Sequence, residues 1–166
     1  MAFTYKFSCT ETAPPWIPGD AAASLAAAGN EPVVQELIFP QLSGGQTSAT
    51  QTVFIQNFTL GTIVGCRLAA KLLTGVVTGT PGNPVDDENG AEVCSEKWLQ
   101  ARVMPAGAWT AIGGPYGPFD GAGNFLALGD IDPAVALEIQ IRIVVPASFS
   151  TIQVARIRLG VGYLDA

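Results

Sequence analysis

The sequence predicts an all-β protein folded as an antiparallel β-sandwich, and three observations lead to this prediction. Apolar and polar residues alternate along residues 136–146, which is the period of a strand with one buried face. Several further alternating runs are separated by turns rich in glycine, proline and asparagine. No segment of the chain carries a convincing pattern for a long helix. The apolar face of the clearest run consists of Leu137, Ile139, Ile141, Ile143 and Val145.

Alternation and turn residues place about seven core strands along the chain. The clearest of them are expected over residues 33–39, 50–56, 63–73, 97–104, 136–146 and 152–163, with a turn at 129–133 before the run over 136–146. In the run over 63–73, Val64, Cys66, Leu68, Ala70 and Leu72 are expected on the buried face. In the last run, the apolar phase changes from Ile152 and Val154 to Ile157, Leu159 and Val161. A bulge or bend near Ala155 and Arg156 is therefore predicted.

Residues 1–30 are predicted to form an N-terminal arm, and residues 31–166 to form the sandwich domain. Residues 3–8 read as a short strand with an aromatic face, and the prolines that follow interrupt regular structure. Residues 20–30 fit either a helix of about two turns or an extended linker. We expect the strand to add to the edge of a neighbouring subunit, with completion of the chain's own sheet as the alternative. The candidate partner contacts are Phe3, Tyr5, Phe7 and Trp16.

The composition favours a protein that packs against neighbours. Apolar residues make up 48% of the chain and charged residues 13%, so its surface is poor in ionic groups. The net charge is −6 and the eight basic residues are scattered, which argues against binding to nucleic acid. No apolar run reaches the length of about 18 residues expected of a membrane-spanning helix. The N-terminus also lacks the layout of a secretory signal.

The residue types exclude several kinds of catalytic site. The chain has no histidine, so Ser-His-Asp and Cys-His machinery and His-ligated zinc are excluded. The three cysteines are far apart, and Cys66 is expected to be a small buried apolar residue. The acidic run over residues 86–88 offers oxygen ligands for calcium but lacks the spacing of a calcium loop, so a solvated loop tip is the favoured interpretation. We expect no enzyme activity, no cofactor and no metal.

Aromatic residues interleave with glycine and proline over residues 107–123 and form a candidate binding surface. Flat aromatic rings bury much area at low entropy cost, so this loop suits a glycan or a peptide. The alternative is that the rings pin the loop to an end of the sandwich. The candidate residues are Trp109, Tyr116 and Phe119, whereas Trp98 is assigned to the core or its margin.

Two stretches, residues 52–68 and 128–146, together resemble bacterial and viral immunoglobulin-like modules. The shared pattern is a strand ending in Asn, a turn and a second strand, and later a turn before a long alternating strand closed by proline. Ala134 stands where that pattern usually has glycine. The resemblance covers residues 33–163, and the whole chain is most similar to an immunoglobulin-like virion protein of a tailed bacteriophage.

This resemblance implies an immunoglobulin-like antiparallel β-sandwich located in the virion. It implies decoration of a capsid, or a place in a tail or baseplate, as a homo-oligomer or multi-copy assembly with other virion proteins. No specific site residue follows from it, because such families share a fold and not a site. The alternative function is a carbohydrate- or host-surface-binding module that uses the Trp109 loop.

Overall fold

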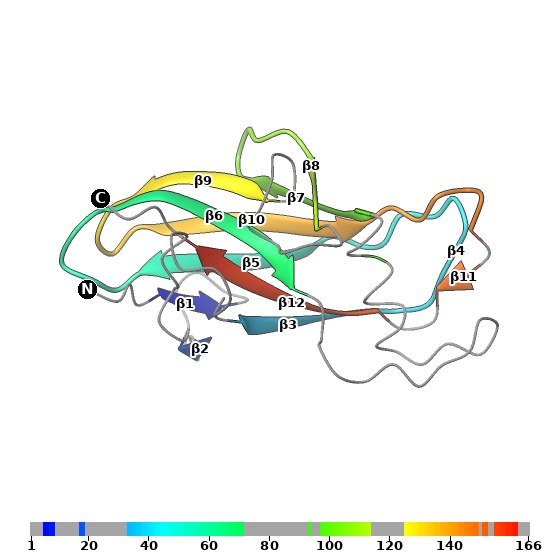
Figure 1. Ribbon diagram of the computed structural model, residues 1–166, viewed down its shortest axis with the longest axis horizontal. Helices are drawn as coiled ribbons and strands as arrows, with labels where there is room; N and C mark the ends of the chain where they lie inside the picture. Colours follow the sequence, from blue (N-terminus) through cyan, green and yellow to red (C-terminus); the bar gives the residue numbers. More distant parts are fainter. Residues whose placement is uncertain are drawn as a thin grey trace.

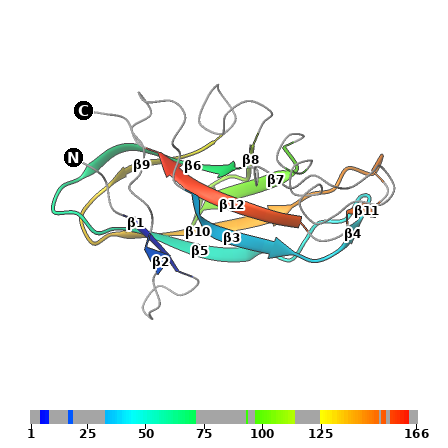
Figure 2. The same cartoon turned by 60° about the horizontal axis from the view of Figure 1, so that its bottom comes forward.

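The computed structural model describes residues 5–8, 17–18, 33–71, 93, 97–113, 125–149, 151–152 and 155–162. These residues form strands and tight connections, and two antiparallel sheets pack face to face (Figures 1 and 2). Ile139, Ile141, Ile143, Leu159 and Val161 are completely buried between the sheets, as their alternation predicts. The predicted all-β sandwich is therefore confirmed.

The larger sheet contains six strands in the order β2-β1-β5-β10-β7-β8. Its strands are β1 (Tyr5–Ser8), β2 (Ile17–Pro18), β5 (Gln51–Asn57), β7 (Leu99–Val103), β8 (Thr110–Ile112) and β10 (Ala136–Ile143). The smaller sheet has the order β3-β12-β6-β9. Its strands are β3 (Val33–Phe39), β6 (Ile63–Lys71), β9 (Leu126–Ile131) and β12 (Ala155–Gly162). A separate pair at one end joins β4 (Leu42–Ser43) to β11 (Thr151–Ile152).

The strand order is that of a jelly roll. Eight of the described strands in the two main sheets form one series when they are taken in chain order. They are β3, β5, β6, β7, β8, β9, β10 and β12. Successive members of this series lie in opposite sheets, except for the β7–β8 hairpin, and the first strand, β3, pairs with the last, β12. This is the winding of two Greek keys in a double-sheet jelly roll.

The immunoglobulin-like order expected from the sequence is therefore wrong. In that fold the first strand pairs with the second in the same sheet. Here β3 and β5 lie in different sheets, and β10 rather than β3 is the neighbour of β5. Alternation and turns predict where strands occur, but they carry no information about the sheet that each strand joins, which explains the error.

The buried face of β6 is interrupted near its start. Val64 was expected in the core with Cys66 and Leu68, but 43% of its surface is exposed. The pairing with β9 shifts register on both sides of Cys66, and Gly65 adopts a positive φ of 63°. This irregularity turns Val64 outward while Cys66 and Leu68 remain buried.

The change of apolar phase near the C-terminus reflects a change of partner strand. β11 pairs with β4 of the end pair, whereas β12 pairs with β3 and β6 of the smaller sheet. Within β12 the register shift lies between Leu159 and Gly160 and not at Ala155 or Arg156, whereas residues 153–154, between β11 and β12, lie outside the described ranges. The break in phase therefore falls between two strands that pair with different partners.

The N-terminal strand β1 belongs to the chain's own sheet. Tyr5 lies opposite Asn57 and Phe7 lies opposite Ile55 of β5, so the expected pairing with a neighbouring subunit is replaced by the intramolecular alternative. The pairing satisfies backbone groups along the β5 edge that would otherwise be exposed. The side chains of Phe3, Tyr5, Phe7 and Trp16 lie outside what the structure describes, so their contacts with partners stay predictions. Residues 20–30, predicted as a short helix or an extended linker, also lie outside the described residues.

The end of the sandwich that carries β4 and β11 is closed by backbone hydrogen bonds between two loops (Figure 1). Gly45 N–H donates to the Val145 carbonyl at 3.0 Å, and Val145 N–H donates to the Gln46 carbonyl at 2.9 Å. Gly44 lies in this contact, and a Cβ added to it would lie only 1.8 Å from the Phe149 carbonyl oxygen.

We expect Gly44→Ala to destabilise the fold by about 1 to 3 kcal/mol, because backbone on both sides must move to relieve the overlap. Gly61→Ala is the matched control, since nothing lies within 4 Å of the Cβ it would add. Urea unfolding of the two variants measures the difference. Equal midpoints for Gly44→Ala and the unmodified protein would show that the two loops are not packed as described.

Candidate functional site

The outward face of the larger sheet carries a block of two arginines and two glutamines. Leu99 and Ala101 of β7 and Ile139 and Ile141 of β10 are completely buried, so the residues between and beside them point away from the core. The register places each arginine opposite a glutamine on the neighbouring strand. The two cross-strand pairs are Arg102 with Gln140 and Arg142 with Gln100.

Each arginine is held by its opposite glutamine. Nε and Nη2 of Arg102 donate to Oε1 of Gln140 at 3.0 and 2.6 Å. In the same way, Nε and Nη2 of Arg142 donate to Oε1 of Gln100 at 3.0 and 2.9 Å. Because both bonds use one edge of the guanidinium, the Nη1 group of each arginine is not part of these pairs. The two guanidinium groups are thereby oriented on the sheet before any ligand arrives.

Trp109 completes this group by packing on both arginines. It immediately precedes β8, whose Thr110 lies opposite Ala101, so Trp109 is brought alongside Arg102. The guanidinium carbon of Arg102 lies 4.6 Å from the centroid of the indole, and that of Arg142 lies 4.0 Å from it. Both distances are in the range of cation–π interactions. We call Gln100, Arg102, Trp109, Gln140 and Arg142 the arginine–tryptophan face.

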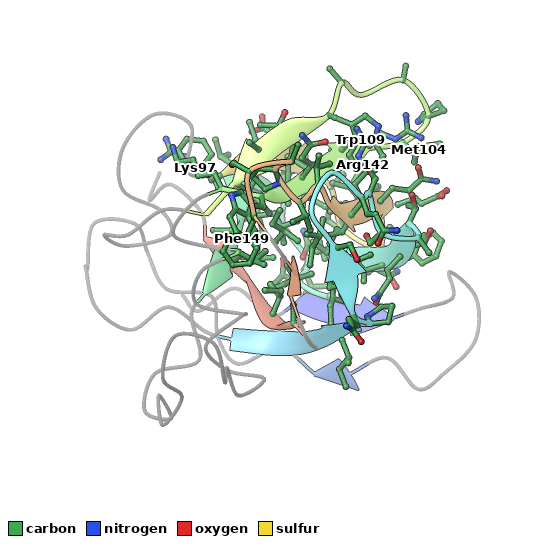
Figure 3. All side chains as sticks on the ribbon, turned by 90° about the vertical axis from the view of Figure 1, so that its right-hand side faces the viewer. Lys97, Met104, Trp109, Arg142 and Phe149 are labelled. Atoms are coloured by element: carbon green, nitrogen blue, oxygen red, sulfur yellow. The ribbon has the colours of Figure 1, made fainter. Side chains whose placement is uncertain are left out.

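The structure thus places one of the three predicted loop aromatics in a defined surface group. Figure 3 shows Trp109 with Arg142 and Met104 on one side of the molecule, away from Lys97 and Phe149. Tyr116 and Phe119 lie outside the described residues. Trp98 packs against the core and lies edge-on to Phe149 with a centroid distance of 4.7 Å, as expected of a residue at the core margin.

The four polar residues of this face were not predicted from the sequence, although a signal for them exists. The pattern Gln-x-Arg occurs twice, at residues 100–102 and 140–142, each time within an alternating run. On antiparallel strands in the right register, two such patterns form reciprocal arginine–glutamine pairs. Only the register of β7 against β10 shows that these two patterns meet.

A second surface group lies at the end of the sandwich opposite β4 and β11, where β5 connects to β6 and β9 connects to β10 (Figure 1). Leu60 is fully exposed there, at 102% of its reference surface. Three further large apolar residues near it are exposed to a lesser extent. We call this group the apolar end, and it consists of Phe58, Leu60, Val64 and Val135.

The buried amide of Asn57 fixes the two loops of the apolar end to each other. Its Nδ2 donates to the Gly61 and Ile131 carbonyls at 2.8 and 2.9 Å. Its Oδ1 accepts hydrogen bonds from the backbone N–H and the hydroxyl of Thr59 at 2.8 and 2.7 Å. The backbone of Asn57 also donates to Val135 and accepts from Ala134 of the second loop. All donors and acceptors of this completely buried side chain are thus satisfied.

Cys66 is not suited to act as a nucleophile. Burial raises the pKa of its thiol to about 12, and the carboxylate of Asp130 adds to the shift. The thiol therefore stays protonated near neutral pH, whereas the thiolate is the reactive form. Its burial agrees with the expectation from the sequence.

Within the described ranges, no cluster of three or more His, Cys, Asp or Glu side chains is placed to hold a metal ion. The acidic run at 86–88 lies outside those ranges. In the same part of the chain, no helix has the length and apolar character needed to cross a membrane.

The arginine–tryptophan face combines fixed donors with a flat ring, which suits it to binding. Comparison of the chain with family models, with curated proteins and with solved structures found no match.

Proposed function

We propose that this protein is a structural subunit of a virus particle that works through protein–protein contacts in a multi-copy assembly. The specific form of the proposal is decoration of a bacteriophage capsid, or a place in its tail or baseplate. The jelly-roll architecture supports it in a general way, because viral capsid domains use this fold. Lectin domains use it too, so the fold alone does not assign the function.

The apolar end is the observation that carries this proposal. Burial of one large aliphatic side chain contributes about 1.5 to 3 kcal/mol, and Leu60 makes none of this gain in the isolated chain. Because the Asn57 hydrogen bonds already hold the loops in place, a partner would bind them at a small cost in ordering. An apolar group exposed on a rigid support is a typical contact for a protein partner.

The test replaces Leu60 with glutamate and measures incorporation into purified particles by mass spectrometry with a copy-number estimate. Because Leu60 is fully exposed, the variant should melt at the temperature of the unmodified protein while its copy number falls at least tenfold. Ile38→Glu is the control, since Ile38 is exposed on β3 of the smaller sheet. Absence of the chain from particles, or normal incorporation of Leu60→Glu, would contradict the proposal.

A second candidate function is recognition of a carbohydrate or a host surface, and the arginine–tryptophan face favours it. Trp109 lies over two oriented arginines on a broad sheet face, which is a suitable platform for a flat ligand. We expect retention on a polysaccharide column, and loss of this retention with Trp109→Ala. If the unmodified protein is retained on neither neutral nor acidic polysaccharides, this second candidate function is contradicted.

A further inference from the structure

We propose that the arginine–tryptophan face binds the carboxylate of an acidic carbohydrate, such as a chain of uronic acid residues. This inference rests on the second candidate function and names its ligand class. It follows from the hydrogen-bonding capacity of the face, from its charge and from the position of the indole ring.

The polar groups that remain for a ligand are almost all donors. Oε1 of Gln100 and Oε1 of Gln140 each accept two hydrogen bonds from the opposite arginine. What these pairs leave is the amide NH₂ of each glutamine and, on each arginine, the Nη1 group together with the second N–H of Nη2. A surface that offers N–H groups in excess matches a ligand rich in acceptors, and a carboxylate accepts hydrogen bonds at both of its oxygens.

The charge of the face points to the same ligand class. Arg102 and Arg142 lie against one indole ring, and neither forms an ion pair with a carboxylate of the described residues. Among the described residues, the outward-facing acid near them is Glu138, which lies on β10 two residues before Gln140 and opposite Phe54 of β5. The charges of Glu138 and of the two arginines add up to one net positive charge. A bound anion would relieve the repulsion between the guanidinium groups.

The geometry of the groups suits a carboxylate attached to a sugar ring. Nη1 and Nη2 of a guanidinium form a planar fork that binds both oxygens of a carboxylate. The indole beside the arginines is partly exposed, and its exposed part offers a flat surface for the ring that carries this carboxylate. An acidic peptide would engage the guanidinium groups without needing the indole. A peptide that binds as an added strand needs a sheet edge, whereas β7 and β10 are interior strands.

The experiment measures binding of a hexagalacturonate to the full chain by titration calorimetry. The same oligosaccharide with its carboxyl groups reduced is the neutral comparison, and hexaglutamate is the peptide comparison. The acidic oligosaccharide should bind at least tenfold more tightly than either. Arg102→Gln and Arg142→Gln should each weaken its binding by about tenfold to a hundredfold, which is the range for charge-assisted hydrogen bonds. Trp109→Ala should weaken it as well.

Arg67→Gln is the matched control. The Arg67 guanidinium also lies over an aromatic ring, 4.1 Å from the centroid of Phe125, but it comes from β6 of the smaller sheet. This variant should bind hexagalacturonate like the unmodified protein. Thermal melting of all variants shows whether they are folded, so that a loss of binding is assigned to the face itself.

The outcomes separate this inference from the function on which it rests. Equal binding of the neutral oligosaccharide, lost with Trp109→Ala, would overturn the carboxylate assignment and leave carbohydrate recognition standing. Tighter binding of hexaglutamate would overturn the carbohydrate assignment, because the partner would then be an acidic protein segment. Absence of binding to all three probes would overturn both. Unchanged binding by a folded Arg102→Gln/Arg142→Gln double variant would place the ligand elsewhere.

Discussion

Replacement of Asn57 by aspartate should cost about 3 kcal/mol or more of the free energy of unfolding at neutral pH. The amide nitrogen that donates to the Gly61 and Ile131 carbonyls would become an oxygen that faces two other oxygens. The site is completely buried, so water cannot replace the lost hydrogen bonds. The variant therefore loses two donors and gains a buried negative charge.

This loss should depend on pH. Burial and the two nearby carbonyls raise the pKa of the introduced carboxyl above its value of about 3.9 in the unfolded chain. A raised pKa in the folded state means that the protonated form is the one that the fold tolerates. The destabilisation is thus smallest below the unfolded pKa and grows as the pH rises from about 4 toward the folded pKa. It is largest above that pKa.

Urea unfolding of Asn57→Asp at pH 4 and pH 7.5 tests both statements. Gln56→Glu is the matched control, because it makes the same chemical change at the preceding residue. The Gln56 amide donates to the Ala134 carbonyl at 2.8 Å in an exposed position, so water can replace that bond. We expect a loss of about 1 kcal/mol or less for the control. A loss for Asn57→Asp that is equal at the two pH values would contradict the burial of this amide.

The Asn57 network also links folding to the proposed contact with a partner. The same side chain that closes the end of the sandwich orients the loop on which Leu60 lies. Incorporation into particles should therefore fall for Asn57→Asp as well as for Leu60→Glu, but only Asn57→Asp should lower the melting temperature. The melting temperature thus distinguishes damage to the Asn57 hydrogen bonds, which hold the loop, from a change of Leu60, which contacts the partner.

The strands could be predicted from the sequence because their signal is local. Alternation along 136–143 identifies β10 and its buried face without any other part of the chain. The order of the strands is not a local property. Strand β3 pairs with β12, which lies more than a hundred residues further along the chain, and nothing in either run indicates that partner. The immunoglobulin-like assignment failed at this step.

The candidate site was predictable to the same extent. Trp109 is recognisable as a large aromatic residue in a loop rich in glycine and proline. Its arginine partners come from two strands 40 residues apart, at positions 102 and 142, and they meet it only through the pairing of β7 with β10 and with β8. Leu60 shows no pattern at all, since its exposure is known only once the loops are placed.

Substitutions of Ile141 and of Val64 test where the local alternation correctly identifies a buried residue and where the fold overrides it. Simple alternation assigns both residues to buried faces, Ile141 in β10 and Val64 in β6. In the structure Ile141 is completely buried, whereas Val64 lies beside the irregularity at Gly65 and is 43% exposed. Ile141→Ala should cost about 2 to 5 kcal/mol, because it removes buried methyl and methylene groups and leaves a cavity.

Val64→Ala should cost no more than about 0.5 kcal/mol, because water already covers much of this side chain and no cavity forms. Unfolding of both variants in urea measures the two free energies under the same conditions. A large loss for Val64→Ala would mean that β6 continues without interruption and that Val64 packs in the core, as the alternation predicts. A small loss for Ile141→Ala would place β10 at the margin of the sandwich, and the pairing with β7 that assembles the arginine–tryptophan face would then be wrong.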